Sequence, residues 1–532
     1  LGPGGLQRLR SGAGPGGRGV GDRGRRNALR AEGGGLPYTD TVSYSLLNIP
    51  GLPQWMDITL VVVDAVIRII ALCWIPYNRK PAVALGWLMA IFLIPYIGII
   101  AFLVIGSRYL PKSRRQRQSR MNELIREQIG DQAILGRHDH LREPAVAAAQ
   151  LNYRLGSLPL TGGNSFELLP DNHESIRVMA DAVDRAREYV HFEFYIVAYD
   201  QTSAPLIDAL FRAHERGVKV HILIDHLGSA GYPGYGELVK MLDRSGISWH
   251  RMLPIRPWRL EWQRPDLRNH RKILVIDGNL AFSGSQNIID RSYNKPKNLR
   301  KGLQWKDLML RIEGPLVDEL NALFISDWYS ETEDLLLDEV DQELPSIDGG
   351  VMAQAVPSGP GFDTENNLRL INQLIYNAED RVLICSPYLI PDDSLKMALT
   401  TAAQSGIDVT LIVCAKGDQF FAHYGQQSYY DSLLEAGVRI MLYPAPTVLH
   451  TKFVLVDHDM TCLGSSNMDV RSFSLNLEVT MMLLSEEITA QVQDVAERYM
   501  AVSDEVDLEQ WRSRPLRTKA LENVCRLTSA LL

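Results

Sequence analysis

Hydrophobic and polar residues follow two different patterns along this chain. From residue 55 to residue 105, apolar side chains continue almost without interruption. From about residue 150 onward, short apolar runs of strand length alternate with segments in which apolar residues recur every three or four positions. The first pattern is typical of membrane-associated helices, and the second is typical of a domain in which strands and helices alternate.

The apolar N-terminal region predicts two membrane-spanning helices, at residues 55–75 and 82–105. The second stretch has 24 residues without a charge, which is enough to cross a bilayer core, although Pro95 can kink it. The first stretch carries charges, of which Asp64 and Arg68 lie four residues apart and can pair on one helix face. An interfacial or core helix is the alternative. The matching lengths and the short turn between the stretches favour a membrane hairpin.

Charge is unevenly distributed along the chain. The net charge is −8, but residues 1–120 hold 16 basic and 5 acidic residues, so the remainder is strongly acidic. A basic cluster from Arg108 to Arg120 follows the second apolar stretch. By the positive-inside rule, residues 106–150 form a basic juxtamembrane linker and the large domain is cytoplasmic. The cluster can also attract anionic lipid headgroups, or it can simply fix the topology. The acidic body argues against a nucleic-acid partner.

The N-terminus and the cysteines add two expectations. Residues 1–50, rich in glycine and arginine over the first 40, are predicted to be disordered because they cannot bury enough apolar surface to offset their ordering entropy. A basic lipid-binding arm is the alternative. The five cysteines show no CxxC spacing, and three lie in strand-like runs. We therefore expect reduced, buried cysteines without disulfides.

The domain after residue 150 repeats its own order of elements. Its first half predicts helix, strand, helix and strand at Ile176–Arg187, Tyr189–Val197, Ala204–Glu215 and Val218–Ile224. Its second half predicts the same order at Leu368–Asn377, Arg381–Cys385, Ser394–Ser405 and Val409–Cys414. We therefore expect an α/β fold with two pseudo-symmetric lobes, residues 151–345 and 346–532, in which mixed sheets are flanked by helices. The second lobe ends in a helical tail, and the site is expected at the seam between the lobes.

One five-residue pattern, His-x-Lys-x4-Asp-x6-Gly-x2-Asn, occurs once in each half. The two copies are His270, Lys272, Asp277, Gly284, Asn287 and His450, Lys452, Asp457, Gly464, Asn467. In each copy the histidine and the lysine lie two apart in a strand-like run, so both side chains face one side and can reach one phosphate. The aspartates complete the motif and are counted with its catalytic residues. Their odd spacing from the histidines turns them to the opposite face of the strand. There we expect them to brace the scaffold rather than to touch the substrate.

Two histidines and two lysines can carry out phosphodiester chemistry without a metal or another cofactor. One neutral imidazole can attack phosphorus, and the second, protonated, can protonate the leaving alkoxide. The lysines supply positive charge, and four motif side chains are expected to bind the nonbridging phosphate oxygens. These four are Ser285, Asn287, Ser465 and Asn467. No other cluster of Asp, Glu and His in the sequence suggests a metal site.

Three further carboxylates stand out near the motifs. Asp307 and Glu478 follow the first and second motif, and each is a candidate to orient a histidine through its other ring nitrogen. An ordinary surface carboxylate is the alternative for both. Glu193 lies in the apolar run Phe192–Ile196, where it can partner a buried cation.

These residues resemble the phospholipase D superfamily, whose hallmark is this duplicated motif, and more narrowly the bacterial cardiolipin synthases. The similarity covers about residues 55–532 and includes the hairpin and the runs Asn269–Lys272, Gly464–Phe473 and Asn476–Val479. It implies an enzyme at the cell membrane that transfers a phosphatidyl group between two phosphatidylglycerol molecules and releases glycerol. It also implies a phosphohistidine on His270, with His450 as general acid and base. The sequence itself is symmetric and leaves the reverse assignment open.

Other functions are compatible with the same motifs. A membrane-bound phospholipase D that hydrolyses or transphosphatidylates other phospholipids is the main alternative, because no motif residue chooses between water and an alcohol. A tethered nuclease is less favoured because the body is acidic. An inactive scaffold is less favoured because both motifs are complete. The sequence leaves the oligomeric state open.

Overall fold

The computed structural model describes residues 53–77, 79–106, 110–129, 141–156, 158–256, 263–336, 339 and 347–527. The predicted disorder of residues 1–50 lies outside them. Residues 1–71 and 72–532 form two compact units. Helix α1 (Gln54–Trp74) begins in the first unit, and within it Asp64 and Arg68 form the predicted ion pair at 2.8 Å.

The second apolar stretch forms two short helices instead of the single helix predicted at residues 82–105. Helix α2 (Pro81–Leu93) ends at Ile94, and α3 (Pro95–Ile105) begins at the next residue. Proline lacks an amide hydrogen and its ring clashes with the preceding turn, so the helix breaks at Pro95. Within the described ranges, none of the helices combines the length and the apolar character needed to cross a membrane, so the hairpin stays a prediction.

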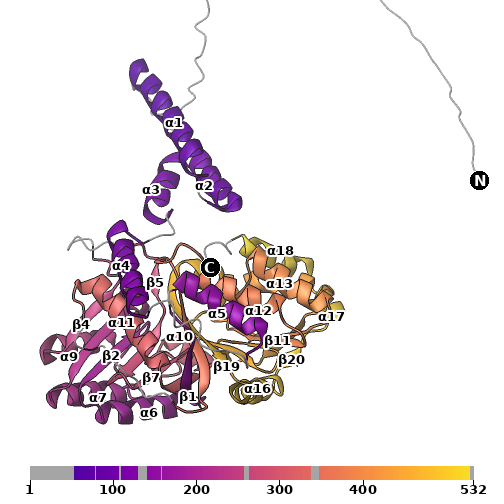
Figure 1. Ribbon diagram of the computed structural model, residues 1–532. Helices are drawn as coiled ribbons and strands as arrows, with labels where there is room; N and C mark the ends of the chain where they lie inside the picture. The colour runs from indigo at the N-terminus through magenta and orange to yellow at the C-terminus, as the bar shows by residue number, and fades with distance from the viewer. Residues whose placement is uncertain are drawn as a thin grey trace, which may run out of the picture. The chain divides into compact units, whose positions relative to one another are not determined.

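The second unit contains two lobes that share one continuous sheet of 16 strands (Figure 1). In the first lobe the sheet contains β1 (Thr161–Leu169), β2 (Tyr189–Phe194), β3 (Lys219–Asp225), β4 (Ser248–Met252), β6 (Lys272–Ile276), β7 (Leu280–Gly284) and β9 (Met309–Glu313). In the second lobe it contains β10 (Val351–Ser358), β11 (Arg381–Cys385), β13 (Asp408–Cys414), β14 (Arg439–Tyr443), β16 (Phe453–Val456), β17 (Met460–Gly464), β19 (Asn476–Leu484) and β20 (Asp504–Glu505). The sixteenth strand, β5 (Arg268–Asn269), pairs with β19 outside the main order.

The two lobes repeat one strand order around a central antiparallel pair, β1–β10. The order is β1-β9-β7-β6-β2-β3-β4 in the first lobe and β10-β19-β17-β16-β11-β13-β14 in the second. Strands β2, β3 and β4 run parallel to one another, and so do β11, β13 and β14. The other neighbours in the main order, including β20 at the edge of the second lobe, pair antiparallel, so the sheet is mixed as predicted. The sequence suggested a sheet in each lobe, and the β1–β10 pair joins them into one.

Helices cover both faces of this sheet (Figure 1). The longer ones are α6 (Asn172–Asp184), α7 (Ala204–Glu215), α9 (Tyr235–Ser245), α11 (Leu316–Thr332), α12 (Asn366–Tyr376), α13 (Asp393–Gln404), α14 (Phe420–Glu435) and α16 (Glu486–Met500). The shorter ones are α8 (His226–Ala230), α10 (Pro296–Lys301), α15 (Val470–Ser474), α17 (Leu508–Arg512) and α18 (Leu516–Arg526). In α6 the residues Ile176, Met179 and Val183 recur at helical spacing and are buried, and the Asp171 side chain caps the first turn.

The predicted basic linker at residues 106–150 is largely helical and packs on the body. Helix α4 (Lys112–Ile129) lies against α11, where Arg114 forms a bidentate pair with Glu331 at 2.5 and 2.6 Å. Helix α5 (Glu143–Gly156) packs with the core of the second lobe, through buried Ala145 and its neighbours. Part of the basic cluster is therefore neutralised by acidic residues of the body.

All five cysteines are free, as predicted, and all except Cys73 are buried. Cys385 and Cys414 lie in β11 and β13, inside the apolar core. Burial raises the pKa of Cys385 well above its ordinary value, and burial also raises the pKa of Cys414. These thiols are therefore inert core side chains rather than nucleophiles.

Two short parallel strand pairs cross between the lobes. In the first, β5 (Arg268–Asn269) pairs with the start of β19. In the second, β15 (Thr447–Leu449) pairs with β8 (Gln304–Lys306). A third short pair, β12 (Leu389–Ile390) with β18 (Met468–Asp469), lies within the second lobe. The crossing pairs are related by the pseudo-symmetry, and each leads directly into a motif histidine.

Candidate active site

The backbone of each motif histidine is fixed by the other lobe. His270 follows β5, and its amide donates to the carbonyl of Leu477 in β19 at 2.8 Å. His450 follows β15, and its amide donates to the carbonyl of Lys306 in β8 at 2.8 Å. The residues directly after these two acceptors are Glu478 and Asp307. The crossing strands thus place each histidine beside a carboxylate from the opposite half of the chain.

Each imidazole is held by that carboxylate. Glu478 Oε2 lies 3.0 Å from His270 Nδ1, and Asp307 Oδ1 lies 2.6 Å from His450 Nδ1. An ionised carboxylate only accepts hydrogen bonds, so Nδ1 donates and the lone pair of the neutral ring lies on Nε2. The two candidates named from the sequence are therefore both beside a histidine. The sequence did not reveal that the pairing is crosswise between the lobes.

The two motif serines hold the carboxylates in turn. The Ser465 hydroxyl donates to Glu478 at 2.5 Å, and the Ser285 hydroxyl donates to Asp307 at 2.8 Å. Their oxygens accept the amides of Val479 and Leu308 at 3.0 Å. Both hydroxyls are therefore engaged inside the protein. The motif had suggested that these serines bind phosphate. In the structure they instead complete two Ser–carboxylate–His chains.

The two motif asparagines are also buried and are not equivalent. Asn287 donates to the Tyr293 hydroxyl at 2.7 Å, and its Oδ1 accepts the Ile196 amide at 3.3 Å. It therefore fixes the loop that follows β7. Asn467 donates to Asp469, while its Oδ1 has no hydrogen-bond partner within the described part of the chain. Of these two asparagines, only Asn467 thus has a side-chain oxygen that is available to bind a further group.

The motif glycines allow the chain to pack closely behind the carboxylates. A Cβ atom on Gly284 would lie 2.4 Å from the carbonyl oxygen of Leu308, directly after Asp307. A Cβ atom on Gly464 would lie 2.2 Å from the carbonyl oxygen of Val479, directly after Glu478. Any other residue would push the carboxylate-bearing strand away.

The two motif lysines are buried at the same seam. Lys272 Nζ donates to the carbonyl of His270 at 2.6 Å, and Lys452 Nζ donates likewise to the carbonyl of His450. Burial lowers the pKa of Lys272 to about 7 and that of Lys452 to about 8, although Glu478 and Asp307 oppose the shift. Each lysine lowers the pKa of both histidines, so the four groups form one electrostatic cluster.

The histidines and carboxylates have complementary pKa shifts. Burial lowers the pKa of His270 to about 4 even though Glu478 raises it, and burial together with Lys452 lowers the pKa of His450. Burial opposes ionisation of Asp307 and Glu478, but the histidines they face keep both pKa values below their usual range. An anionic phosphodiester in the seam would raise the pKa of both imidazoles.

The motif aspartates lie on the far side of their strands. Asp277 accepts the amides of residues 187–189 at 2.8 to 3.0 Å. Asp457 accepts the amides of residues 379–381 and the guanidinium of Arg142 at 2.8 Å. Both residues have positive φ, 48° and 54°, at the turn that follows the strand. Their placement supports the bracing role that the odd spacing indicated, rather than contact with a substrate.

Replacing Asp277 with alanine is expected to lower the free energy of unfolding by about 1–3 kcal/mol, because three backbone amides lose their acceptor. Turnover per folded molecule should change little. Thermal or denaturant unfolding, measured beside kcat, checks both statements. Asp277→Asn is the matched control, since asparagine keeps an acceptor and tolerates positive φ. A large loss of kcat in a fully stable Asp277→Ala protein would contradict the bracing role.

The pH profile of kcat/KM is expected to be bell-shaped. A nucleophilic His270 must be neutral, so activity should fall as pH drops through its pKa of about 4. On the alkaline side His450 must keep its proton and the lysines their charge. Activity should therefore fall first as His450, whose pKa burial lowers, loses its proton, and more steeply as pH rises through the lysine pKa values of about 7 and 8. Measuring kcat/KM against pH in mixed micelles tests this. Lys272→Arg, which stays charged, should make the alkaline limb less steep. An unchanged limb in both Lys272→Arg and Lys452→Arg would contradict the assignment.

Several residues of the site carry no motif signal in the sequence. Tyr195 packs edge-on against the His270 ring at 4.7 Å and lies under Lys272. Asn172, in the first turn of α6, donates to Asp307 at 3.1 Å. Glu193 is buried and accepts from Asn269 at 2.5 Å, and it also interacts electrostatically with Arg271, a buried cation of the kind predicted.

Comparison with known proteins agrees with both lobes. Residues 179–328 and 371–500 match the family model described as cardiolipin synthase, PLD-like domain. Cardiolipin synthase A of Proteus mirabilis is 31% identical over 464 residues, covering 86% of this chain and 94% of that protein. The cardiolipin synthase of a Geobacillus species is 33% identical over 467 residues, covering 86% and 90%. The crystal structure of phosphatidylserine synthase from Haemophilus influenzae has a TM-score of 0.53 at 16% identity, covering 74% of this chain and 100% of that one, which shows a likeness of fold.

Proposed function

The chain belongs to the cardiolipin synthase family, and we propose that it transfers the phosphatidyl group of one phosphatidylglycerol to a second one with release of glycerol. The observation that supports this best is the pair of crosswise Ser–carboxylate–His chains. They present two Nε2 atoms and two buried lysines at one seam. This set contains a nucleophile, a proton donor and positive charge for the phosphate oxygens.

In the first step, Nε2 of neutral His270 attacks the phosphorus of the donor lipid. The P–N bond forms while the bond from phosphorus to the glycerol oxygen breaks. The leaving glycerol oxygen takes a proton from Nε2 of His450, whose positive form is stabilised by Asp307. Lys272 and Lys452 balance the charge that develops on the nonbridging oxygens. The products are free glycerol and a phosphatidyl group on His270.

In the second step, a hydroxyl of the second phosphatidylglycerol replaces His270 on phosphorus. His450, now neutral, removes the hydroxyl proton as the P–O bond forms and the P–N bond breaks. This restores the starting protonation of both histidines. The order of the two histidines rests on the family resemblance, because the geometry of the two halves is closely matched. Water in place of the lipid hydroxyl would give phosphatidic acid instead.

A product assay tests the proposed acceptor directly. Purified enzyme in micelles receives phosphatidylglycerol of defined acyl chains as its only phospholipid, and the products are identified by mass spectrometry. We expect cardiolipin and glycerol in a one-to-one ratio. Phosphatidic acid without cardiolipin would overturn the proposal in favour of a hydrolytic phospholipase D. A parallel reaction with added phosphatidylethanolamine reports whether that lipid is also used as an acceptor.

We also propose that the apolar helices hold the enzyme in the cell membrane, with the catalytic unit in the cytoplasm. In support of this, α2 and α3 contain no charged side chain, and most of their large apolar side chains are exposed. In intact cells, a membrane-impermeant maleimide should not label Tyr77→Cys in a Cys73→Ser background. The reason is that Arg79 donates to the carbonyl of Gly106 at 3.3 Å and Lys80 pairs with Asp392 at 3.3 Å, which holds this turn on the side of the catalytic unit. The matched control, Asp393→Cys, should be labelled only after lysis. Labelling of Asp393→Cys in intact cells would contradict the topology.

A further inference from the structure

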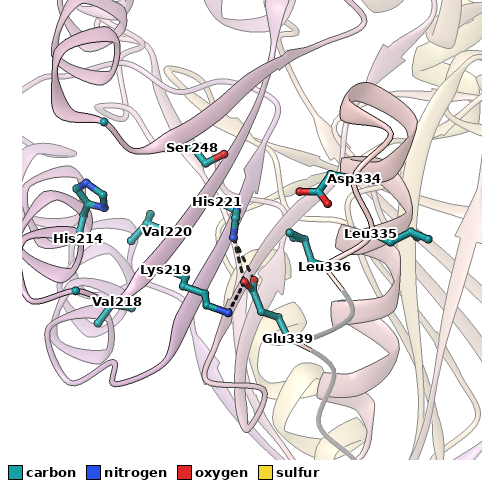
Figure 2. A pocket seen from close by; sticks show the side chains of 12 residues that line it. His214, Val218, Lys219, Val220, His221, Ser248, Asp334, Leu335, Leu336 and Glu339 are labelled. Atoms are coloured by element: carbon teal, nitrogen blue, oxygen red, sulfur yellow. Dashed lines mark hydrogen bonds and ion pairs between the residues drawn. The ribbon is translucent and has the colours of Figure 1, made fainter.

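A pocket of about 490 Å³ lies in the first lobe, outside the motif residues (Figure 2). Its walls come from the turn before β3, from β3 itself and from the chain that follows α11. Figure 2 shows Glu339 pointing into it, with His221 and Lys219 turned toward the carboxylate. Glu339 belongs to the segment that connects α11 of the first lobe to β10 of the second.

Three metal-ligating side chains meet at this place. His191 in β2 and His221 in β3 are direct partners in the parallel strand register, so they project side by side from one face of the sheet. Glu339 Oε2 lies 2.8 Å from His191 Nε2 and 3.2 Å from His221 Nε2. One ligand atom from each residue lies within 4.8 Å of the other two. The mechanism proposed above uses none of the three.

The hydrogen bonds around His191 place a ring proton on Nδ1. Asn321 Nδ2 donates to the backbone carbonyl of Glu339 at 2.9 Å, which fixes the orientation of that amide. Asn321 Oδ1 therefore accepts from His191 Nδ1 at 2.7 Å. In the neutral ring the Nε2 lone pair then faces the Glu339 carboxylate at 2.8 Å, so two acceptors oppose each other. A cation between them would satisfy both.

The alternative is a proton on Nε2, which would make His191 an imidazolium. That ring is fully buried, between Phe324 stacked at 4.3 Å and the edge of His221. A charged ring in this apolar surrounding would be costly to bury. A neutral His191 beside an ionised Glu339 is the ligand state that a divalent metal requires.

We propose that His191, His221 and Glu339 bind a Zn²⁺ ion, or a divalent ion of similar chemistry, at a site separate from the catalytic seam. Two imidazoles and one carboxylate suit zinc, and they leave a fourth position toward the pocket for water. Tetrahedral ligands at about 2.0–2.1 Å from zinc lie about 3.3 Å apart, so the present separations need only a small opening. Asn321 supplies the second contact that orients a metal-bound histidine.

Lys219 is compatible with this site. Its Nζ lies 3.2 Å from Glu339 Oε1, the oxygen that is turned away from His191, and its side chain is 55% exposed. It can therefore pair with one carboxylate oxygen while the other binds the metal. The bound ion would tie the connection between the lobes to the sheet of the first lobe. It would add stability without taking part in phosphatidyl transfer.

Metal analysis of the purified full-length enzyme tests the proposal. After chelation and reloading with Zn²⁺, we expect one tightly bound equivalent by elemental mass spectrometry and a rise in Tm. His221→Ala and Glu339→Gln should each weaken binding at least about 100-fold. His250→Ala, which replaces a nearby exposed histidine outside the cluster, should bind as the unmodified enzyme does. The variant His270→Ala/His450→Ala should also keep its equivalent, which separates this site from the motifs.

Cobalt provides a second readout that does not depend on the stability of any variant. Co²⁺ bound to the unmodified enzyme should show the visible absorption of a four- or five-coordinate site with nitrogen and oxygen ligands. Absence of this spectrum together with absence of bound Zn²⁺ would overturn the proposal. So would loss of the metal only when His270 and His450 are replaced, because the ion would then belong to the catalytic seam.

Discussion

Replacing His270 with alanine is expected to lower phosphatidyl transfer by at least about 10⁴-fold, because the variant lacks the group that forms the covalent intermediate. His450→Ala should cause a loss of similar size, since glycerol would have to leave without a proton. Both side chains are nearly buried and line the seam, so small changes in unfolding temperature are expected. Cardiolipin formation is measured by mass spectrometry, and folding by thermal unfolding.

The same pair of variants can distinguish the two roles. In a single turnover the phosphatidyl adduct should map to the peptide that contains His270 and should be absent from His270→Ala. An adduct on His450 would reverse the assignment and leave the rest of the mechanism intact. His423→Ala is the control, because this half-buried histidine in α14 belongs to neither motif. Full activity in either His270→Ala or His450→Ala would contradict the two-histidine mechanism.

Asp307→Asn and Glu478→Gln are expected to lower kcat by about 10²–10⁴-fold, since an amide neither fixes the reactive tautomer nor stabilises an imidazolium. The crosswise pairing adds a sharper expectation. With a donor lipid whose leaving group is a nitrophenol, the first step needs no protonation. Release of nitrophenol should then recover in Asp307→Asn and His450→Ala, but not in Glu478→Gln or His270→Ala.

This comparison tests the geometry as well as the chemistry. Asp307 belongs to the same half of the chain as His270, so a same-lobe pairing would make Asp307→Asn behave like His270→Ala. That result would contradict the structure. Glu319→Gln is the matched control, because Glu319 is also buried and bonds to Thr161 and to the Ala355 amide. Burial raises the pKa of Glu319 well above its usual value, which favours an uncharged carboxyl group. The uncharged amide of glutamine should therefore be tolerated, and kcat should not change.

Most regular elements could be predicted from apolar periodicity. Ala204–Glu215 and Arg381–Cys385 have the predicted bounds. Helix α6 begins at Asn172, four residues before the predicted start. Its first turn buries polar side chains that contact the site, with Asn172 bonded to Asp307 and Ser175 to Gln286. A pattern of apolar positions cannot reveal a helical turn that is buried through polar contacts.

The residues of the site were also recognisable, but their connections were not. Spacing of two placed His270 and Lys272 on one face of a strand, and odd spacing turned Asp277 away. The pairing of His270 with Glu478 depends on strands that are 208 residues apart and belong to different lobes. Local spacing contains no information about such a pairing. For the same reason Ser285 and Ser465 were assigned to the phosphate, although they bond to carboxylates.

The crossing strands have a consequence for the origin and dissection of such a protein. Either half, produced alone, would contain one histidine without its carboxylate and one carboxylate without its histidine. It would also expose the edge of β1 or β10, which is paired in the intact sheet. A single half could therefore become complete only by associating with a second half through that edge. An ancestor with one motif would have worked as a symmetric dimer, and fusion of two copies would have made the association permanent.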